Sequence, residues 1–295
     1  MTRPEFLPPR PELPDGMAPP EEPRPPDGAA PGPPPRAIPL WAPFAVMGIV
    51  FIVVGTFYAA IIGIATSIDS SISSSHPPES LTLAVTVVQD AFLLLAAVLT
   101  FKLVQGRVRP ADLGLRRVVD WRRALLTALA VYAIYWVISG LLSALFGPQP
   151  DQQIVEDLKT EDSLAILLGF AVLTCVVAPI CEEIFFRGFV FTTFARRLGP
   201  RWGALIAGGI FGLIHAPNPA LGLIALGVLG VCLCALYWRT QSIIPCMALH
   251  ALNNSISFGY TKSLDAGLYA ALVVGSVGLV VALATAVSSR PAVTA

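Results

Sequence analysis

Long apolar runs separated by short polar segments dominate the chain after residue 40. A helix that spans a bilayer needs about 20 predominantly apolar residues. The runs predict helices over residues 44–66, 81–101, 124–146, 164–194, 202–216, 219–238, 243–258 and 268–287. We therefore predict an all-α, polytopic membrane protein with about eight transmembrane helices, of which the fifth and seventh are short for a span.

The composition agrees with this pattern. Hydrophobic residues make up 55% of the chain and charged residues 13%, as expected for a membrane protein rather than a soluble domain. The formal net charge is zero, which gives no reason to expect nucleic acid as a partner. All five cysteines fall inside apolar runs, so we expect buried free thiols and no disulfide framework.

Residues 1–40 differ from the rest of the chain. They contain more than half of the 27 prolines together with scattered charges, and almost no aliphatic residues. Such a segment cannot bury enough apolar surface to fold, so we predict a disordered, proline-rich tail. The helices then form a second region, residues 41–290.

Basic residues in the loops indicate the topology, because Lys and Arg accumulate on the cytoplasmic side of a membrane. The segment between the second and third helices carries Lys102, Arg107, Arg109, Arg116, Arg117, Arg122 and Arg123, and the turn between the fourth and fifth carries Arg196, Arg197 and Arg201. The alternate loops are nearly free of positive charge. The tail and the C-terminus are therefore both placed in the cytoplasm of what we expect to be a bacterial cell.

Three charges interrupt the apolar run 164–194: Glu182, Glu183 and Arg187. A charge near the middle of a bilayer costs roughly 2.5 to 3.5 kcal/mol even on a lenient scale, so such residues are usually functional. Pro179, three residues before Glu182, should kink the helix near that point, and such a kink can open a water-filled pocket.

Two histidines are expected at similar depth. Glu182 precedes Arg196 by as many residues as separate Arg201 from His215, so both side chains lie about 21 Å from the same basic turn at 1.5 Å per residue. By the same argument His250 lies about 16 Å from the next basic turn. The sequence therefore predicts that both histidines approach the glutamates from other helices.

The local spacings suggest a chemical role for each of these residues. Three pairs are four residues apart and share a helix face: Glu183 with Arg187, Phe211 with His215, and His250 with Asn254. If Arg187 pairs with Glu183, Glu182 remains as a general base that, beside a histidine, can activate water. His250 and Asn254 can then donate hydrogen bonds to a developing oxyanion.

These motifs, Glu-Glu-x-x-x-Arg, Phe-x-x-x-His and His-x-x-x-Asn in this order, resemble the CAAX-protease and bacteriocin-processing family of intramembrane endopeptidases. The resemblance covers residues 179–254, the motif core of the protease domain 41–290, and the segment 113–117 is also similar to family members. It implies that Glu182 and His215 activate the attacking water. It also implies that His250 and Asn254 form the oxyanion hole and that Glu183 and Arg187 support the site.

Other readings of the same residues stay open. Glu182, His215 and His250 could bind zinc, although no His-Glu-x-x-His motif is present and another base would then be needed. Cys181 could act as a nucleophile, but a thiol in apolar surroundings is a poor one. We expect no resident metal or other cofactor, and a membrane-associated or lipidated polypeptide as the substrate.

Two further function classes remain. A proton-coupled transporter would use the buried carboxylates and histidines as a relay, and Asp90 in the second helix favours that reading. A catalytically idle scaffold would use the polar cluster only to fix helix packing.

Overall fold

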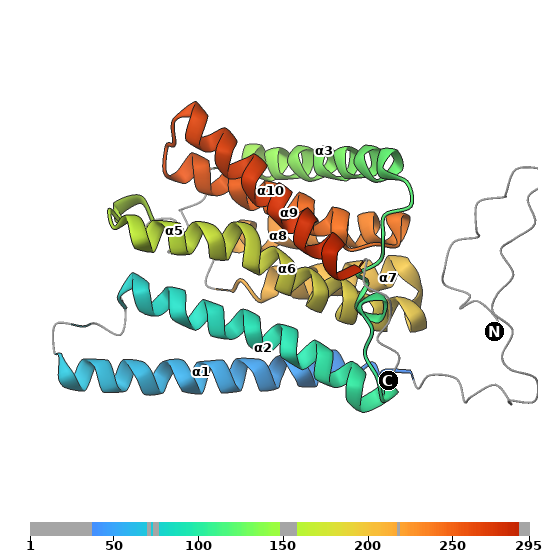
Figure 1. The fold of residues 1–295 in the computed structure, drawn as a ribbon, viewed down its shortest axis with the longest axis horizontal. Helices are drawn as coiled ribbons and strands as arrows, with labels where there is room; N and C mark the ends of the chain where they lie inside the picture. Colours follow the sequence, from blue (N-terminus) through green and yellow to red (C-terminus); the bar gives the residue numbers. More distant parts are fainter. Residues whose placement is uncertain (1–36, 70–71, 73–76, 148–157, 217–218, 289–295) are drawn as a thin grey trace, which may run out of the picture.

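The computed structural model describes residues 37–69, 72, 77–147, 158–216 and 219–288. The tail that we predict to be disordered lies almost wholly outside this part. Within it the protein is all-helical, without strands, as predicted (Figure 1).

The helices follow the predicted apolar runs closely. They are α1 (Ala42–Ile68), α2 (Glu79–Gln105), α3 (Trp121–Phe146), α5 (Leu164–Val172), α6 (Ala178–Glu183), α7 (Thr192–Leu213), α8 (Ala220–Thr240), α9 (Ile244–Thr261) and α10 (Ala266–Ser288). A short 3-10 helix, η1 (Pro110–Leu113), lies in the basic loop before α3, and two π-helical segments, η2 (Leu173–Val177) and η3 (Ile184–Phe191), flank α6.

Residues 164–213 are helical throughout except at one kink, where the two predicted helices 164–194 and 202–216 meet. The only internal residue outside helical dihedrals is Gly199, with φ of 81°, which precedes Pro200. Glycine adopts positive φ at little cost and proline cannot continue a helix, so the chain reverses here. The predicted turn is therefore present as a sharp kink within α7.

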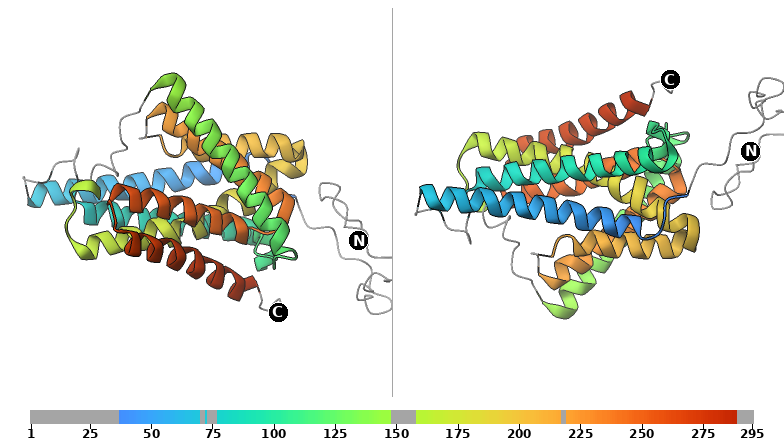
Figure 2. Two further views of the ribbon diagram at one scale, coloured as in Figure 1. Left: turned by 90° about the horizontal axis from the view of Figure 1, so that it is seen from above. Right: turned by 90° about the horizontal axis from the view of Figure 1, so that it is seen from below.

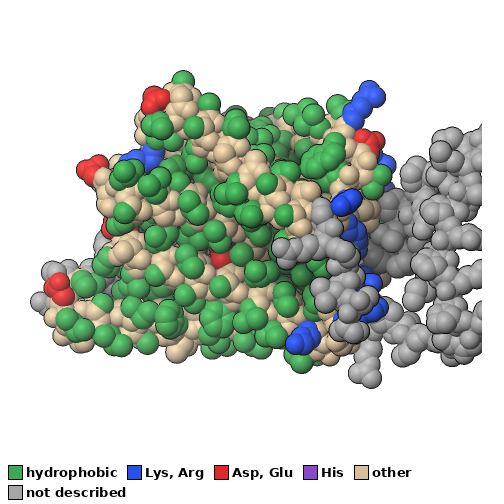
Figure 3. All heavy atoms as spheres, viewed as in Figure 1, with side chains coloured by type: hydrophobic (Ala, Val, Ile, Leu, Met, Phe, Trp, Pro, Cys, Tyr) green, Lys and Arg blue, Asp and Glu red, His purple; other side chains and the backbone are tan. Residues whose placement is uncertain are grey.

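Six stretches are long and apolar enough to cross a membrane, judged within the described residues: α1, α2, α3, 164–213, α8 and α10. The predicted spans 202–216 and 243–258 do not count as separate crossings by these criteria. Many large apolar side chains lie on the outer surface, including Ile52, Leu103 and Trp136, as expected where lipid replaces water (Figure 3). The protein is an integral membrane protein.

The chain starts α1 and ends α10 at the same end of the bundle, beside the segment that joins α2 to α3 (Figure 1). Lys and Arg side chains gather mainly at this end (Figure 3). This agrees with the predicted alternation of basic and nonbasic loops. The assignment of the basic end to the cytoplasm stays a prediction.

The long stretch 164–213 and α9 form the centre of the bundle. Phe185, Phe186 and Phe189 are fully buried there, with α2 packed on α6 and η3. α7 and α8 pack closely on each other, and α8 also packs on α3. α1 lies beside α2 at the periphery (Figure 2).

The basic loop is anchored in the core. A Cβ at Gly188 of η3 would collide with the backbone carbonyl of Leu113, so this glycine permits the loop to touch the central helix. Gly114, with φ of 83°, accepts a hydrogen bond from the backbone N–H of Ile243 at 3.1 Å. The segment 113–117 therefore ties the start of α9 to the helix that carries the glutamates.

Candidate active site

The two glutamates lie at the end of α6, between the two π-helical segments. Pro179 does not interrupt the backbone there. It lacks an N–H group, so the carbonyl of Thr174, five residues earlier, loses the donor that a π-helix would supply. Asn254 of α9 fills this gap, because its Nδ2 donates to the Thr174 oxygen at 2.8 Å. Instead of the predicted kink, the helix continues past Pro179 with widened, π-helical turns on both sides of α6.

Glu183 and Arg187 form the predicted ion pair. Arg187 Nη1 donates to Glu183 Oε1 at 2.8 Å, and both side chains are completely buried. Arg187 Nη2 also donates to the carbonyl of Gly230 on α8 at 3.1 Å. The guanidinium carbon lies 4.7 Å from the centre of the Phe211 ring, a cation–π contact. Arg187 therefore joins the central helix, α7 and α8.

His250 contacts Glu183 rather than Glu182. Its Nδ1 donates to the same Oε1 that Arg187 contacts, at 2.9 Å. This fixes the orientation of the ring, so Nε2 is the nitrogen that faces Glu182, at 3.9 Å from Oε2. That distance is too long for a direct hydrogen bond, but one water molecule can bridge such a gap. Sequence spacing did not indicate that Glu183 would accept from two side chains.

The side chain of Glu182 is more exposed than that of its neighbour Glu183. Its side chain is 12% exposed, whereas that of Glu183 is fully buried. Glu182 Oε2 is buried and has no hydrogen-bond partner among the described residues. A carboxylate oxygen without a protein partner is available to water or to a substrate proton.

His215 follows the last turn of α7 and is half-buried. Its Nδ1 donates to the carbonyl of Phe211 at 2.8 Å, which leaves Nε2 as the nitrogen free to accept a proton. The Phe211 ring lies beside both histidines, with centroid distances of 5.2 Å to His215 and 5.8 Å to His250. No hydrogen bond or ion pair within the described part of the chain joins His215 to Glu182.

Hydrogen bonds to both polar atoms hold the side-chain amide of Asn254 in one orientation. Besides its bond to Thr174, its Oδ1 accepts from Asn253 Nδ2 at 3.4 Å, and Asn253 Oδ1 in turn accepts from the hydroxyl of Tyr132 on α3 at 3.4 Å. An amide nitrogen has two hydrogens, so Asn254 retains one donor beyond the Thr174 bond. Asn253 and Tyr132 were not anticipated, because adjacent positions on a helix point to different faces.

Asp90 of α2 lies near this cluster. It is 1% exposed, and neither carboxylate oxygen has a partner among the described residues. It interacts electrostatically with Glu182, and α2 packs directly on α6. The sequence identified Asp90 as unusual but did not place it beside Glu182.

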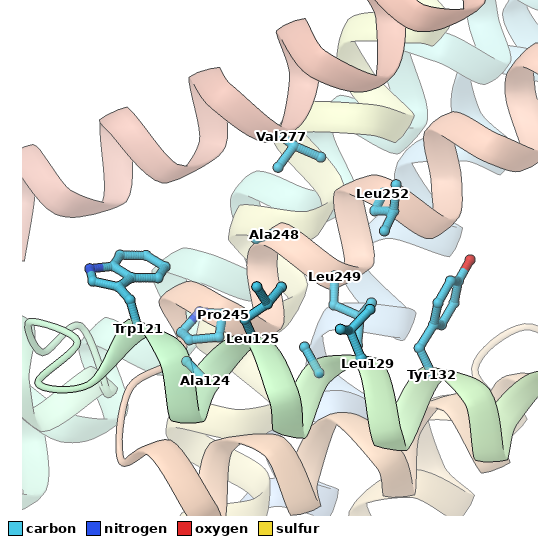
Figure 4. Close-up of a pocket in the computed structure, with 11 residues that line it drawn as sticks. Trp121, Ala124, Leu125, Leu129, Tyr132, Pro245, Ala248, Leu249, Leu252 and Val277 are labelled. Atoms are coloured by element: carbon cyan, nitrogen blue, oxygen red, sulfur yellow. The ribbon is translucent and has the colours of Figure 1, made fainter.

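An apolar pocket of about 200 Å³ lies on the outer side of α9, between α3 and α10. Figure 4 shows Leu125 and Leu129 of α3 directed toward Leu249 and Leu252 of α9. Tyr132 lies at one end of the pocket, so its hydroxyl links the pocket wall to Asn253. Leu249 directly precedes His250 in the sequence, and Leu252 follows it by two residues. The pocket and the polar cluster therefore lie on different faces of the same helix, α9.

A metal would have to be held by Glu182, His215 and His250. Across the described residues, no group of three or more His, Cys, Asp and Glu side chains is arranged to hold a metal ion. His250 uses Nδ1 for Glu183, and the Phe211 ring lies beside both histidines. The five cysteines, Cys181 included, are free and buried. The expectation that the site needs no metal stays a prediction.

Comparisons with known proteins single out the same region. Residues 164–256 match the family model described as Rce1-like, type II CAAX prenyl endopeptidase. A protein of Bacillus subtilis (strain 168) called uncharacterized protein YyaK is 29% identical over 143 residues, which covers 46% of this chain and 46% of that protein. The chain thus matches about half the length of this relative. No solved structure matches the chain.

The matched region begins with the first residue of the central helical stretch and ends just after Asn254. It contains every residue of the three motifs, from Glu182 to Asn254. The resemblance drawn from those motifs is therefore confirmed for this region: residues 164–256 are similar to the Rce1-like type II CAAX prenyl endopeptidases.

Proposed function

We propose that this protein is an intramembrane endopeptidase that hydrolyses a peptide bond of a membrane-associated or lipidated polypeptide. The observation that carries the proposal is the buried arrangement of Arg187, Glu183 and His250 beside Glu182, whose Oε2 faces His250 Nε2 at 3.9 Å and has no hydrogen-bond partner among the described residues. A structural staple would need only the ion pair. It would not explain a second glutamate that no arginine neutralises within the described residues and that lies inside an apolar bundle.

In the proposed mechanism Glu182 removes a proton from the attacking water. Glu182 Oε2 and His250 Nε2 lie 3.9 Å apart, so one water molecule beside them can form a hydrogen bond with both atoms. His215 assists through Nε2, because its other nitrogen is held by the Phe211 carbonyl. Proton removal by a positioned base contributes about 10² to 10⁴ to the rate.

The oxyanion that forms at the scissile carbonyl needs donors that do not reorient during the reaction. His250 can donate from Nε2 when that nitrogen carries a proton, and Asn254 can donate its remaining amide hydrogen. Glu183 orients the imidazole, and the Thr174 carbonyl orients the amide. Arg187 acts through Glu183 as a positioning residue.

The direct test reconstitutes the purified full-length protein in liposomes with a fluorogenic peptide carrying a membrane-anchoring lipid. We expect cleavage by the wild-type protein and none by Glu182→Gln. Peptides with a prenyl chain, an acyl chain or no lipid would show which anchor the enzyme requires. Absence of cleavage for all peptides, in liposomes where the protein is folded and correctly oriented, would count against the proposal.

Asp90 is the observation that favours a proton-coupled transporter as the second candidate, since it places another buried carboxylate near Glu182. The same liposomes, loaded with a pH-sensitive dye, separate the two functions. A transporter gives proton flux that Asp90→Asn abolishes, whereas a peptidase gives cleavage without flux. A folded protein that shows neither activity would support the scaffold reading.

We further propose that the peptidase works without a resident metal. A glutamate that coordinates a metal tightly loses the basicity that the mechanism requires of Glu182. Elemental analysis of active protein should give well under one transition metal per chain, and dialysis against a chelator should leave the rate unchanged. Stoichiometric zinc whose removal abolishes activity, with recovery when it is restored, would overturn this assignment.

A further inference from the structure

A furrow runs along the outside of the bundle between α3 and α7, with α8 as its floor. α8 packs closely on both of these helices. The furrow consists of two adjoining pockets of about 680 Å³ and 530 Å³, which share Leu205 and Val231 in their linings. None of the catalytic candidates lines either pocket.

The two pockets differ in chemistry. Three arginines from three different helices line the first: Arg123 at the start of α3, Arg201 in α7 and Arg239 near the end of α8. The second is lined almost wholly by aliphatic side chains, among them Ile134, Ile138 and Ile224. The furrow therefore has a cationic head and an apolar groove.

The three guanidinium groups are available to a ligand. All three arginines are exposed, and none forms an ion pair with a described residue, in contrast to Arg187 and Arg109. Arg123 lies in the first turn of α3, Arg201 follows the kink at Gly199, and Arg239 lies in the last turn of α8. Arginine matches the geometry of a phosphate group, because its planar fork can donate two parallel hydrogen bonds.

The groove has the length of a lipid chain. From Arg239 to Leu223, α8 extends about 24 Å at 1.5 Å per residue. This exceeds half of the ~30 Å hydrocarbon thickness of a bilayer, so an acyl chain from one leaflet fits along it. Basic pockets between transmembrane helices are a recurring way to recognise anionic lipid head groups.

We propose that this furrow binds an anionic phospholipid, with the phosphate at Arg123, Arg201 and Arg239 and one acyl chain along the groove between α3 and α7. A free phosphate would leave the apolar groove unused, and a zwitterionic lipid would leave the triple positive charge uncompensated. The proposal does not depend on the peptidase activity.

Two kinds of variant test the site. The triple substitution R123Q/R201Q/R239Q removes the cationic head, and R107Q/R117Q/R122Q removes the same charge from exposed residues at the same end that do not line the furrow. Gly209→Leu fills the groove, since a Cβ at Gly209 meets no atom within 4 Å. Gly275→Leu on α10 is its control, with equally open space outside the furrow.

The experiment measures binding of dioleoylphosphatidylglycerol to the full-length protein in neutral detergent, by native mass spectrometry and by the shift in melting temperature. Dioleoylphosphatidylcholine and glycerol 3-phosphate are the comparison ligands. We expect phosphatidylglycerol alone to stay bound and to raise the melting temperature by several degrees. Its affinity should fall at least tenfold in the R123Q/R201Q/R239Q triple variant and in Gly209→Leu, and remain at the wild-type value in both controls.

Several results would overturn the proposal. Equal binding of phosphatidylcholine would remove the role of the arginines, and equal stabilisation by glycerol 3-phosphate would indicate a free anion site. Equal losses in the two triple variants would show that only the total charge matters. If Gly209→Leu melts like the wild type without lipid and still binds phosphatidylglycerol unchanged, the groove does not hold the chain.

Discussion

Glu183 and His250, which are 67 residues apart in the sequence, are joined by a 2.9 Å hydrogen bond inside the bundle. The same glutamate oxygen also accepts from Arg187 at 2.8 Å. The glutamate that looks like the simple partner of an arginine is thus the residue that orients a catalytic candidate. The neighbouring Glu182 has no hydrogen-bond partner for Oε2 among the described residues, and we propose that this oxygen acts on water.

The first prediction concerns the buried pair. Arg187→Ala leaves Glu183 as a buried carboxylate without its cation, and breaking a buried pair in this way typically costs about 3 to 5 kcal/mol. We expect a lower melting temperature in detergent together with loss of activity. The double variant Glu183→Gln/Arg187→Gln removes both charges and should melt above Arg187→Ala. A double variant that melts no higher would contradict the coupling of the two residues.

The second prediction concerns the contact between the basic loop and the central helix. Gly188→Ala places a Cβ against the backbone carbonyl of Leu113. This carbonyl can move away from the Cβ only if the whole loop moves. We expect destabilisation of about 1 to 3 kcal/mol, the usual cost of overpacking. The matched control is Gly209→Ala, where the added methyl group meets open space. Equal melting temperatures for the two variants would show that the loop is not anchored at Gly188.

The third prediction concerns Asp90. Neither carboxylate oxygen of the buried Asp90 has a hydrogen-bond partner among the described residues. Burying such a group costs more folding free energy than burying an apolar side chain of similar shape. Asp90→Leu should therefore raise the free energy of unfolding by about 1 to 3 kcal/mol in a detergent melt. Destabilisation of that size would instead indicate that Asp90 has a partner in the folded protein.

The fourth prediction separates two roles of Asn254. Asn254→Ala removes the donor to the Thr174 carbonyl, so stability should fall by about 1 to 3 kcal/mol, the cost of an unsatisfied buried group. If the amide also donates to the oxyanion, kcat should fall by about 10² to 10³. Stability and kcat are measured on the same preparation at a temperature where the variant is fully folded. A loss of stability with unchanged kcat would leave Asn254 a purely structural residue.

The helices and the Glu183–Arg187 pair could be predicted from the sequence because both depend on local spacing. The apolar runs differ from the observed helices by only a few residues at most ends, and a pair four residues apart shares a helix face wherever the helix packs. The break at residues 199–200 could be predicted from the glycine and proline there.

The tertiary contacts of the site could not be predicted in the same way. Residue spacing predicts that His215 and His250 lie at about the depth of the glutamates in the membrane. It does not predict the rotation of each helix about its axis, and this rotation determines that His250 forms its hydrogen bond with Glu183 rather than with Glu182. The bond from Asn254 to Thr174 depends on π-helical turns, and those have no sequence signature comparable to a cap or a turn. The anchoring role of Gly188 depends on a loop whose position only packing determines.

Cleavage of a lipid-anchored peptide by Glu182→Gln, compared with wild type and with the half-buried control Glu79→Gln at the start of α2, tests the central claim most directly. The substitution removes the base without breaking a described hydrogen bond to Oε2, so the melting temperature should remain close to that of the wild type. We predict that turnover falls by 10² or more for Glu182→Gln, as for loss of a general base, and is unchanged for Glu79→Gln. Retention of more than about a tenth of wild-type turnover by folded Glu182→Gln would contradict the assignment of Glu182 as the base that activates water.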